Sequence, residues 1–166
     1  MKKLLYIFIG SLLLSSCSLK YSFTGASIAP DVKTVSILYF PTYAANANPN
    51  LSQEFTQSLQ DKFISLTNLQ QVTKDGDLNF EGEITGYKVT PVAIQANETA
   101  ALNRLTITIS VRFTNTKDSK QNFDSSFSRF ADFDASKNLS EAEEGLIKEI
   151  NEQLTQDIFN KSVTNW

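Results

Sequence analysis

Apolar and polar residues alternate strictly from residue 104 to residue 114, within a strand-like run that extends to residue 116. The apolar positions are Leu105, Ile107, Ile109, Val111 and Phe113, and the polar positions are Arg104, Thr106, Thr108, Ser110, Arg112 and Thr114. Because successive side chains of a strand point to opposite faces, this pattern predicts an antiparallel strand with one buried face and one open face. The turn residues 117–120 predict a hairpin whose second strand covers residues 121–133.

Three further segments have the composition of strands. Residues 33–40 are β-branched and aromatic with an almost continuous apolar end, which predicts a buried central strand. Residues 69–73 predict a short strand, and apolar residues alternate with polar ones over residues 78–89. The Asp75-Gly76 turn between the last two segments predicts that they pair as a hairpin.

Two segments have the periodicity of amphipathic helices. The apolar positions of the first are Leu51, Phe55, Leu59, Phe63 and Leu66. Asn50 or Ser52 is placed to cap its start. The apolar positions of the second are Ala142, Leu146, Ile150, Leu154 and Ile158. Ser140 and Glu143 have the spacing of a capping box at its start, and each helix is expected to bury one face.

Together these elements predict an α+β fold of order β-α-β-β-β-α. It is a two-layer sandwich, a mixed sheet of about four main strands with two amphipathic helices on one face. The first strand, the first helix and the segment at 69–73 form a β-α-β unit, whose strands we expect to be parallel. One domain over residues 33–166 accounts for all elements, and the outer face of its sheet is left to water or to a partner.

The N-terminal residues have the pattern of an export signal. Two lysines precede an apolar stretch over residues 4–14, and two serines follow it. A membrane-spanning helix needs about 20 apolar residues, so this stretch is too short to serve as a permanent anchor. We therefore expect residues 1–16 to be a signal peptide that is removed.

Cys17 directly follows this stretch and is the one cysteine of the chain. A lone thiol is open to several roles: a core side chain, half of an intermolecular disulfide, a nucleophile or a modified residue. The run Leu14-Ser15-Ser16-Cys17 resembles the lipobox of bacterial lipoproteins, in which the cysteine is joined to diacylglycerol and becomes the new amino terminus. This resemblance implies that Cys17 is lipidated and that residues 17–32 form a tether. Two or more acyl chains would hold the protein stably at a membrane.

Composition and charge exclude several classes of function. The formal net charge is −3, and loss of the two N-terminal lysines moves it to −5, so we expect no nucleic-acid partner. The sequence contains no histidine, and the lipid would consume its one cysteine. The usual ligands for zinc, copper and iron and the usual nucleophile–base pairs are therefore missing. We expect no metal, no catalytic residues and no cofactor beyond the covalent lipid on Cys17.

Pairs of carboxylates are the remaining route to catalysis. Glu81 and Glu83 lie two residues apart on a predicted strand and hence on one face, as a hydrolytic dyad would require. The alternative is a solvated strand face. The other close pairs are Asp75/Asp77, which flank a turn glycine, and Asp132/Asp134, which close a strand.

Three stretches carry a resemblance to a known family. They are FEGEITGYKVTPVAIQ (80–95), ETAALNRLTITISVRFTNTKDSKQNF (98–123) and INEQLTQDIFNKSVTNW (150–166). With the element order and the lipidated cysteine, they resemble the LptE family of lipopolysaccharide-assembly lipoproteins, in its Bacteroidetes branch. The resemblance implies a protein on the periplasmic face of the outer membrane that plugs the LptD β-barrel, helps it assemble and binds lipopolysaccharide. Surface-exported lipoproteins of Bacteroidetes carry acidic residues just after the cysteine; residues 18–22 contain none, which favours the periplasmic side.

Binding of lipopolysaccharide phosphates would require cations on the strands. The candidates are Lys88, Arg104, Arg112 and Arg129. The alternative is that all four are solubilising surface charges. A second functional hypothesis is a lipid- or glycan-binding periplasmic lipoprotein of another envelope transport system, and a third is the carboxylate-dependent hydrolase described above.

Overall fold

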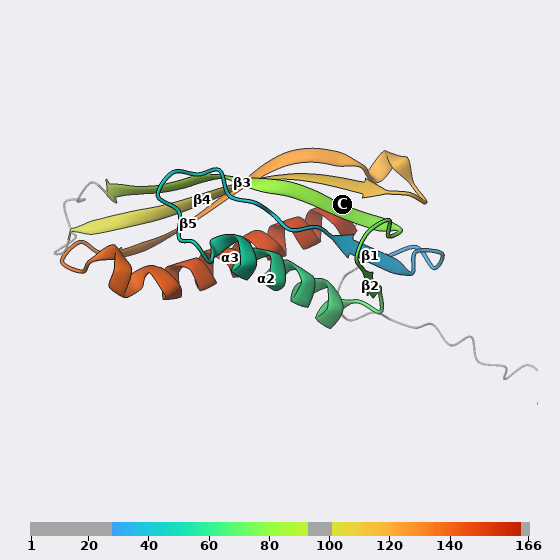
Figure 1. Cartoon of the computed structure of the whole chain (residues 1–166), viewed down its shortest axis with the longest axis horizontal. Helices are drawn as coiled ribbons and strands as arrows, with labels where there is room; N and C mark the ends of the chain where they lie inside the picture. Colours follow the sequence, from blue (N-terminus) through green and yellow to red (C-terminus); the bar gives the residue numbers. More distant parts are fainter. Residues whose placement is uncertain (1–27, 93–100, 164–166) are drawn as a thin grey trace, which may run out of the picture.

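A computed structural model describes residues 28–92 and 101–163. Its elements are β1 (Thr34–Ile37), α2 (Leu51–Leu66), β2 (Gln70–Val72), β3 (Leu78–Val92), β4 (Leu102–Asn115), the 3₁₀ turn η1 (Ser119–Gln121), β5 (Phe123–Asp134) and α3 (Leu139–Val163). The strands form one sheet in the order β2-β1-β3-β4-β5, and both helices cover one of its faces (Figure 1). The predicted α+β two-layer sandwich is confirmed, with five strands rather than about four.

The expected signal peptide and the lipidation site at Cys17 lie outside the described residues. Within the described residues, neither α2 nor α3 combines the length and the apolar character that crossing a membrane takes.

The strand β1 lies between β2 and β3 and pairs in parallel with both. The β-α-β unit of β1, α2 and β2 is therefore parallel, as predicted. The predicted hairpin between residues 69–73 and 78–89 is wrong, because β1 separates the two strands. The connection crosses the backbone of β1 at Gly76, where a Cβ atom would lie 2.6 Å from the Ser36 nitrogen and 2.9 Å from the Val35 carbonyl carbon. Only glycine leaves room for so close an approach.

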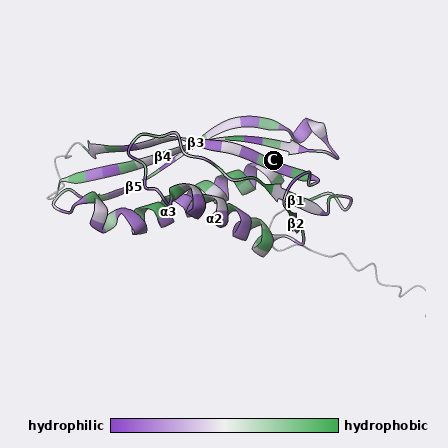
Figure 2. Cartoon of the chain, viewed as in Figure 1, coloured by the Kyte–Doolittle hydropathy of each residue, from purple (hydrophilic) through white to green (hydrophobic). Residues whose placement is uncertain are grey.

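The strands β3, β4 and β5 form a long antiparallel meander. Hydrophobic and hydrophilic positions alternate along these strands (Figure 2). The side of β4 predicted to be apolar is the buried one, and it faces the helices. A register shift between Ile84 and Gly86 inserts one extra residue into β3. Odd-numbered residues of β3 point away from the helices before this bulge, and even-numbered residues do so after it.

Phenylalanine rings join the sheet to both helices. Phe63 of α2 packs against Phe80 of β3 with ring centroids 4.7 Å apart, and against Phe159 of α3 at 5.1 Å. Phe40, which follows β1, meets Phe55 of α2 edge-on at 5.2 Å. All five rings are at most 1% exposed. This core fixes the helices on one face and leaves the other face of the sheet free.

The start of α3 differs from the predicted capping box. The helix begins at Leu139, and the Glu143 carboxylate does not return to the helix N-terminus. One of its oxygens accepts a hydrogen bond from the Tyr87 hydroxyl of β3, and the other accepts one from Asn48 Nδ2 at 2.9 Å. Glu143 therefore joins α3 to the sheet and to the loop before α2.

Candidate functional site

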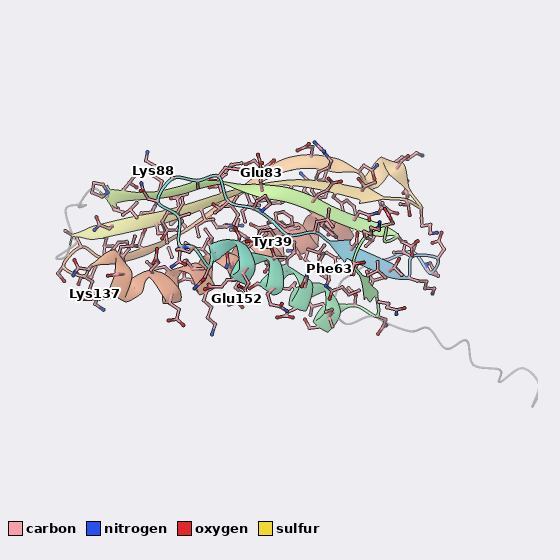
Figure 3. The ribbon with its side chains drawn as sticks, viewed as in Figure 1. Tyr39, Phe63, Glu83, Lys88, Lys137 and Glu152 are labelled. Atoms are coloured by element: carbon pink, nitrogen blue, oxygen red, sulfur yellow. The ribbon has the colours of Figure 1, made fainter. Side chains whose placement is uncertain are left out.

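The face of the sheet opposite the helices is polar, and we call it the open sheet face. Its side chains come from alternate positions of β3, β4 and β5, which the strand register aligns in rows. Lys88 and Glu83 point to this side, away from both helices (Figure 3). Two of its rows are Glu81–Arg112–Asp124 and Thr90–Arg104–Asp132.

At one end of this face Arg104 and Asp132 form a two-point ion pair. Arg104 Nε donates to Asp132 Oδ1 at 2.7 Å, and Nη2 donates to Oδ2 at 2.8 Å. The guanidinium carbon also lies 3.6 Å from the ring centroid of Phe130, which is 46% exposed. The hydrogen bonds from Arg104 lower the pKa of Asp132, and the same contact raises the pKa of Arg104. Arg104 is therefore held in one geometry by a carboxylate and an aromatic ring.

At the other end Arg112 makes a looser pair. Its Nη2 and Nε lie 3.3 and 3.4 Å from Asp124 Oδ2. The two side chains are 63% and 60% exposed, and the register places Glu81 on the other side of Arg112. A pair as exposed as this one contributes little to stability, and its cation is free to exchange partners.

The other two predicted cations have different positions. Lys88 lies on the open sheet face opposite Thr106, and it forms no ion pair with any described residue. Arg129 pairs in the register with the fully buried Ile107, so it lies on the helix side of the sheet. There its guanidinium donates to both carboxylate oxygens of Asp157 on α3, at 2.5 and 2.8 Å. The structure therefore brings three of the four candidates onto one face and places Arg129 on the other.

Acidic side chains outnumber the cations on the open sheet face. Its acids are Glu81, Glu83, Asp124, Asp132 and Asp134, and its cations are Lys88, Arg104 and Arg112. The pairing of the arginines with Asp124 and Asp132 is absent from the sequence-based prediction. The two residues of each pair are equally far along the chain from Asp118. A hairpin with its turn at residues 117–120 therefore places each arginine opposite its aspartate, and the sequence could have predicted both contacts.

The predicted pair Glu81 and Glu83 does share one face, as expected from its spacing. Both side chains are exposed and line an open pocket of about 270 Å³ beside Ser110 and Arg112. Nothing buries either carboxylate, so neither has the desolvated setting that prepares a carboxylate for acid–base catalysis. In the part of the chain that the structure describes, no three His, Cys, Asp or Glu side chains gather to hold a metal ion.

Two of the remaining predicted acids, Asp77 and Asp134, have structural contacts. Asp77 Oδ2 accepts hydrogen bonds from the backbone nitrogens of Lys33 and Thr34 at 2.8 and 3.0 Å, at the start of β1. Its other oxygen lies 3.0 Å from Lys117 Nζ. These donors lower the pKa of Asp77 strongly. Asp134 accepts from the Ser136 nitrogen at 2.8 Å in the turn before α3.

An exposed apolar segment runs beside the edge of β3. It follows β1 and returns to β3 where Tyr43 N donates to the Ile84 carbonyl at 3.1 Å. Leu38, Tyr39 and Tyr43 are 42%, 60% and 74% exposed. Large apolar side chains exposed together in one short segment are typical of a contact surface for a partner.

Comparison with known proteins identifies a family. The family model described as LptE, lipopolysaccharide-assembly, matches residues 32–162. No curated protein matches the sequence. Among solved structures, a neuraminyllactose-binding hemagglutinin homolog from Helicobacter pylori is similar with a TM-score of 0.53 and 9% identity, over 85% of this chain and 88% of that one. The hypothetical protein CT253 from Chlamydia trachomatis has a TM-score of 0.51 and 11% identity, over 80% and 99%. At such low identity these two structures establish a shared fold alone.

Proposed function

Because the chain belongs to the LptE lipopolysaccharide-assembly family, we propose that it is a non-catalytic component of lipopolysaccharide transport. In this proposal it plugs and supports an LptD-type β-barrel of the outer membrane and binds lipopolysaccharide. The family match carries the proposal, since residues 32–162 take in every strand and nearly all of both helices.

The proposed location is the periplasmic face of the outer membrane. The lipobox-like run before Cys17 supports a lipid anchor there, and the acid-free residues 18–22 support the periplasmic side. Acyl chains on Cys17 would hold the domain at the membrane while its sheet and helices stay in water.

The surfaces of the domain support a barrel as the partner. The lumen of a large outer-membrane barrel is polar, and the open sheet face offers hydroxyl, amide and charged groups of both signs that suit it. Tyr39 and Tyr43 would add large amphipathic side chains at the edge of that face, of the kind enriched in protein interfaces.

We propose a ranking of the four cations by how readily each would contact a phosphate of lipopolysaccharide. Lys88 comes first, because its ammonium needs no exchange of an ion-pair partner. Arg112 comes second, because its pair with Asp124 is long and exposed. Arg104 must release a two-point contact, and Arg129 is held by Asp157 on the helix side, so it contributes least.

Affinity purification of the tagged full-length protein from outer membranes tests the proposal. We expect a large β-barrel to be recovered with it, and we expect depletion of the protein to trap lipopolysaccharide inside the cell. Recovery of the protein alone, with export unimpaired on depletion, would overturn the proposal. So would native mass spectrometry that finds a bound lipid or glycan without a barrel.

A pair of lysine variants tests the phosphate contact separately. Lys88→Gln removes the unpaired cation of the open sheet face, and Lys137→Gln removes an exposed lysine on the helix side (Figure 3). We expect only Lys88→Gln to weaken binding of lipopolysaccharide to the purified protein. Equal binding by both variants would remove Lys88 from the proposed site.

A further inference from the structure

The outer edge of β5 is a long row of unpaired backbone groups. β5 is the last strand of the sheet, and its register with β4 runs without a break from Phe123 to Asp134 (Figure 1). Just past its end, the Ala135 nitrogen donates to the Ala101 carbonyl. Odd-numbered residues of β5 therefore turn their backbone groups to β4, and even-numbered residues turn theirs outward. No described residue forms a hydrogen bond with the outward backbone groups of residues 124–132.

The other edges of the sheet are protected. β2 has only three residues. Along the edge of β3, the segment after β1 bonds to Ile84, and farther on Pro91 has no N–H to offer to an added strand. β5 has 12 residues and neither a proline nor a bulge. Natural sheets block or shorten their edges, because an unpaired edge invites another strand. The edge of β5 lacks these devices, which indicates that a strand covers it.

The helix side of β5 is also incompletely covered. Phe123 and Phe127 face the helices, but both are only partly buried. The exposed Lys161 of α3 lies beside them, with its Nζ 4.9 Å from the ring centroid of Phe123 and 5.7 Å from that of Phe127. Its Nζ also donates to Ser125 Oγ at 2.8 Å. A strand beyond β5 with apolar side chains on its helix side would cover both rings.

The chain enters the fold beside the start of β5. Ile28, the first described residue, is partly buried against the core. It lines a small cavity with Gln121, two residues before β5, and with Ser162 near the end of α3. Residues 18–27 lie outside the described part of the chain and join Ile28 to the expected lipidation site at Cys17. A segment of this chain therefore ends next to the unpaired edge.

The sequence of that segment alternates as a strand does. Its apolar positions are Leu19, Tyr21 and Phe23, and its polar positions are Lys20, Ser22 and Thr24. Strict alternation with aromatic residues is typical of a strand with one buried face. Three small residues follow, at positions 25–27.

We propose that residues 19–24 pair with the outer edge of β5 as a sixth strand of the sheet. Because the segment ends beside the start of β5, it would run antiparallel to β5. The three residues 25–27 span at most about 10 Å and would connect this strand to Ile28. Leu19, Tyr21 and Phe23 would lie on the helix side, where the two partly buried rings of β5 await cover.

This pairing would fix the lipid anchor at the edge of the sheet. A free tether of residues 18–27 reaches about 35 Å, whereas a paired one holds Cys17 directly beyond the end of the sixth strand. The edge of β5 would then face the membrane. The inference goes beyond the proposed function, because it requires neither the barrel nor lipopolysaccharide.

A second copy of the chain fits this edge less well. Side chains opposite each other on paired strands share a face. Two antiparallel β5 strands that overlap fully would therefore place Asp124 opposite Asp132 or Asp134 of the other copy. Like charges directly opposite each other are destabilising. Residues 19–24 contain no acid, and Lys20 would lie on the same face as these aspartates.

Trypsin cleavage after Lys20, in the mature lipidated protein in detergent micelles, tests the inference. Ser126→Pro removes an outward N–H of β5 and leaves its bonds to β4. Val89→Pro makes the same change at the free edge of β3, since Val89 points its N–H as Pro91 would. We expect cleavage to be at least about tenfold faster in Ser126→Pro than in the wild type, and unchanged in Val89→Pro. Equal cleavage of Ser126→Pro and the wild type would overturn the inference.

A variant of the segment itself decides the outcome if Ser126→Pro does not fold. Phe23→Ser removes an apolar side chain from the helix side of the proposed strand and leaves the described domain unchanged. We expect it to speed cleavage after Lys20 in the same way. Thr24→Ser, on the other face, is its matched control and should cleave as the wild type does. Equal cleavage of Phe23→Ser and Thr24→Ser would overturn the inference.

A photo-crosslinking residue in place of Ser128 identifies the strand on this edge. We expect it to label a peptide from residues 18–27 of the same chain. A mixture of tagged and untagged protein separates this result from labelling of a second copy. Labelling of a second copy or of another protein would overturn the inference, and so would the absence of any label.

Discussion

Arg104 of β4 and Asp132 of β5 lie opposite each other and are joined by two hydrogen bonds, of 2.7 and 2.8 Å. The same guanidinium covers the exposed ring of Phe130. The pair sits on the open sheet face, so the arginine best placed for two-point phosphate binding already holds an anion. Any phosphate that binds there must displace Asp132.

This competition leads to the first prediction. Asp132→Asn removes the competing charge, so we expect the purified protein to bind lipopolysaccharide several-fold more tightly, while Arg104→Gln should weaken binding. Asp157→Asn frees Arg129 in the same way on the helix side, and we expect it to leave binding unchanged. Thermophoresis with labelled lipopolysaccharide measures all three variants. An equal gain from Asp132→Asn and Asp157→Asn would contradict the placement of the site on the open sheet face.

How far the sequence predicts the site depends on whether the strand alternation is regular. The alternation of β4 has no break, so it places Arg104 and Arg112 on the correct face. In β3, regular alternation from the outward-facing Glu81 would place Lys88 on the helix side. The bulge after Ile84 shifts the alternation by one residue and places Lys88 on the open sheet face. A glycine inside a strand can mark a bulge, but β3 contains two, Gly82 and Gly86, and the sequence does not show which of them does so. The face of Arg129 is equally hard to predict, because phenylalanines occur on both sides of β5.

The topology was harder to predict than the elements. Asp75-Gly76 is a typical hairpin turn, and local turn chemistry alone predicts pairing of the strands on either side. The pairing of β1 with both strands is a long-range contact that buries Val35 and Ile37, and it overrides the local signal.

The crossing at Gly76 leads to the second prediction. In Gly76→Ala the new methyl group would meet the backbone of β1 at 2.6 Å, so the chain must shift, and we expect a loss of about 1–3 kcal/mol in the free energy of unfolding. Gly145 lies in α3 with nothing within 4 Å of a Cβ, and Gly145→Ala should gain about 0.5–1 kcal/mol. Urea unfolding of both variants measures the difference. Similar effects of both substitutions would contradict the close crossing.

The contacts of Asp77 lead to a prediction about acid. Backbone hydrogen bonds from Lys33 and the ion pair with Lys117 hold its folded-state pKa below the ordinary value of 3.8. A lowered pKa contributes stability that is present above 3.8 and is lost as the pH falls through the folded-state value. Asp77→Asn has no carboxylate there to protonate. We therefore expect the free energy of unfolding to fall more steeply in the wild type than in Asp77→Asn between about pH 5 and pH 2. If the free energy of unfolding depended on pH in the same way in both proteins, the contacts assigned to Asp77 would be contradicted.

The hydroxyl of Tyr87 leads to a prediction about alkali. Burial, together with the hydrogen bond to Glu143, raises its pKa above the ordinary value of 10.0. A raised pKa contributes stability that is fully present below 10.0 and is lost as the pH rises through the folded-state value. At neutral pH we expect Tyr87→Phe to lower the free energy of unfolding by about 1 kcal/mol, because Glu143 loses a donor.

Above about pH 10 the difference in free energy of unfolding between the wild type and Tyr87→Phe should shrink. The wild type must ionise a tyrosine beside a carboxylate there, and the variant need not. Tyr43→Phe is the matched control, since Tyr43 is 74% exposed and should follow the wild type at every pH. Chemical denaturation at about pH 7 and about pH 11 measures the three proteins. A constant deficit of Tyr87→Phe across this range would mean that Tyr87 titrates as it does in the unfolded chain. The contact with Glu143 would then not be what keeps the hydroxyl of Tyr87 protonated.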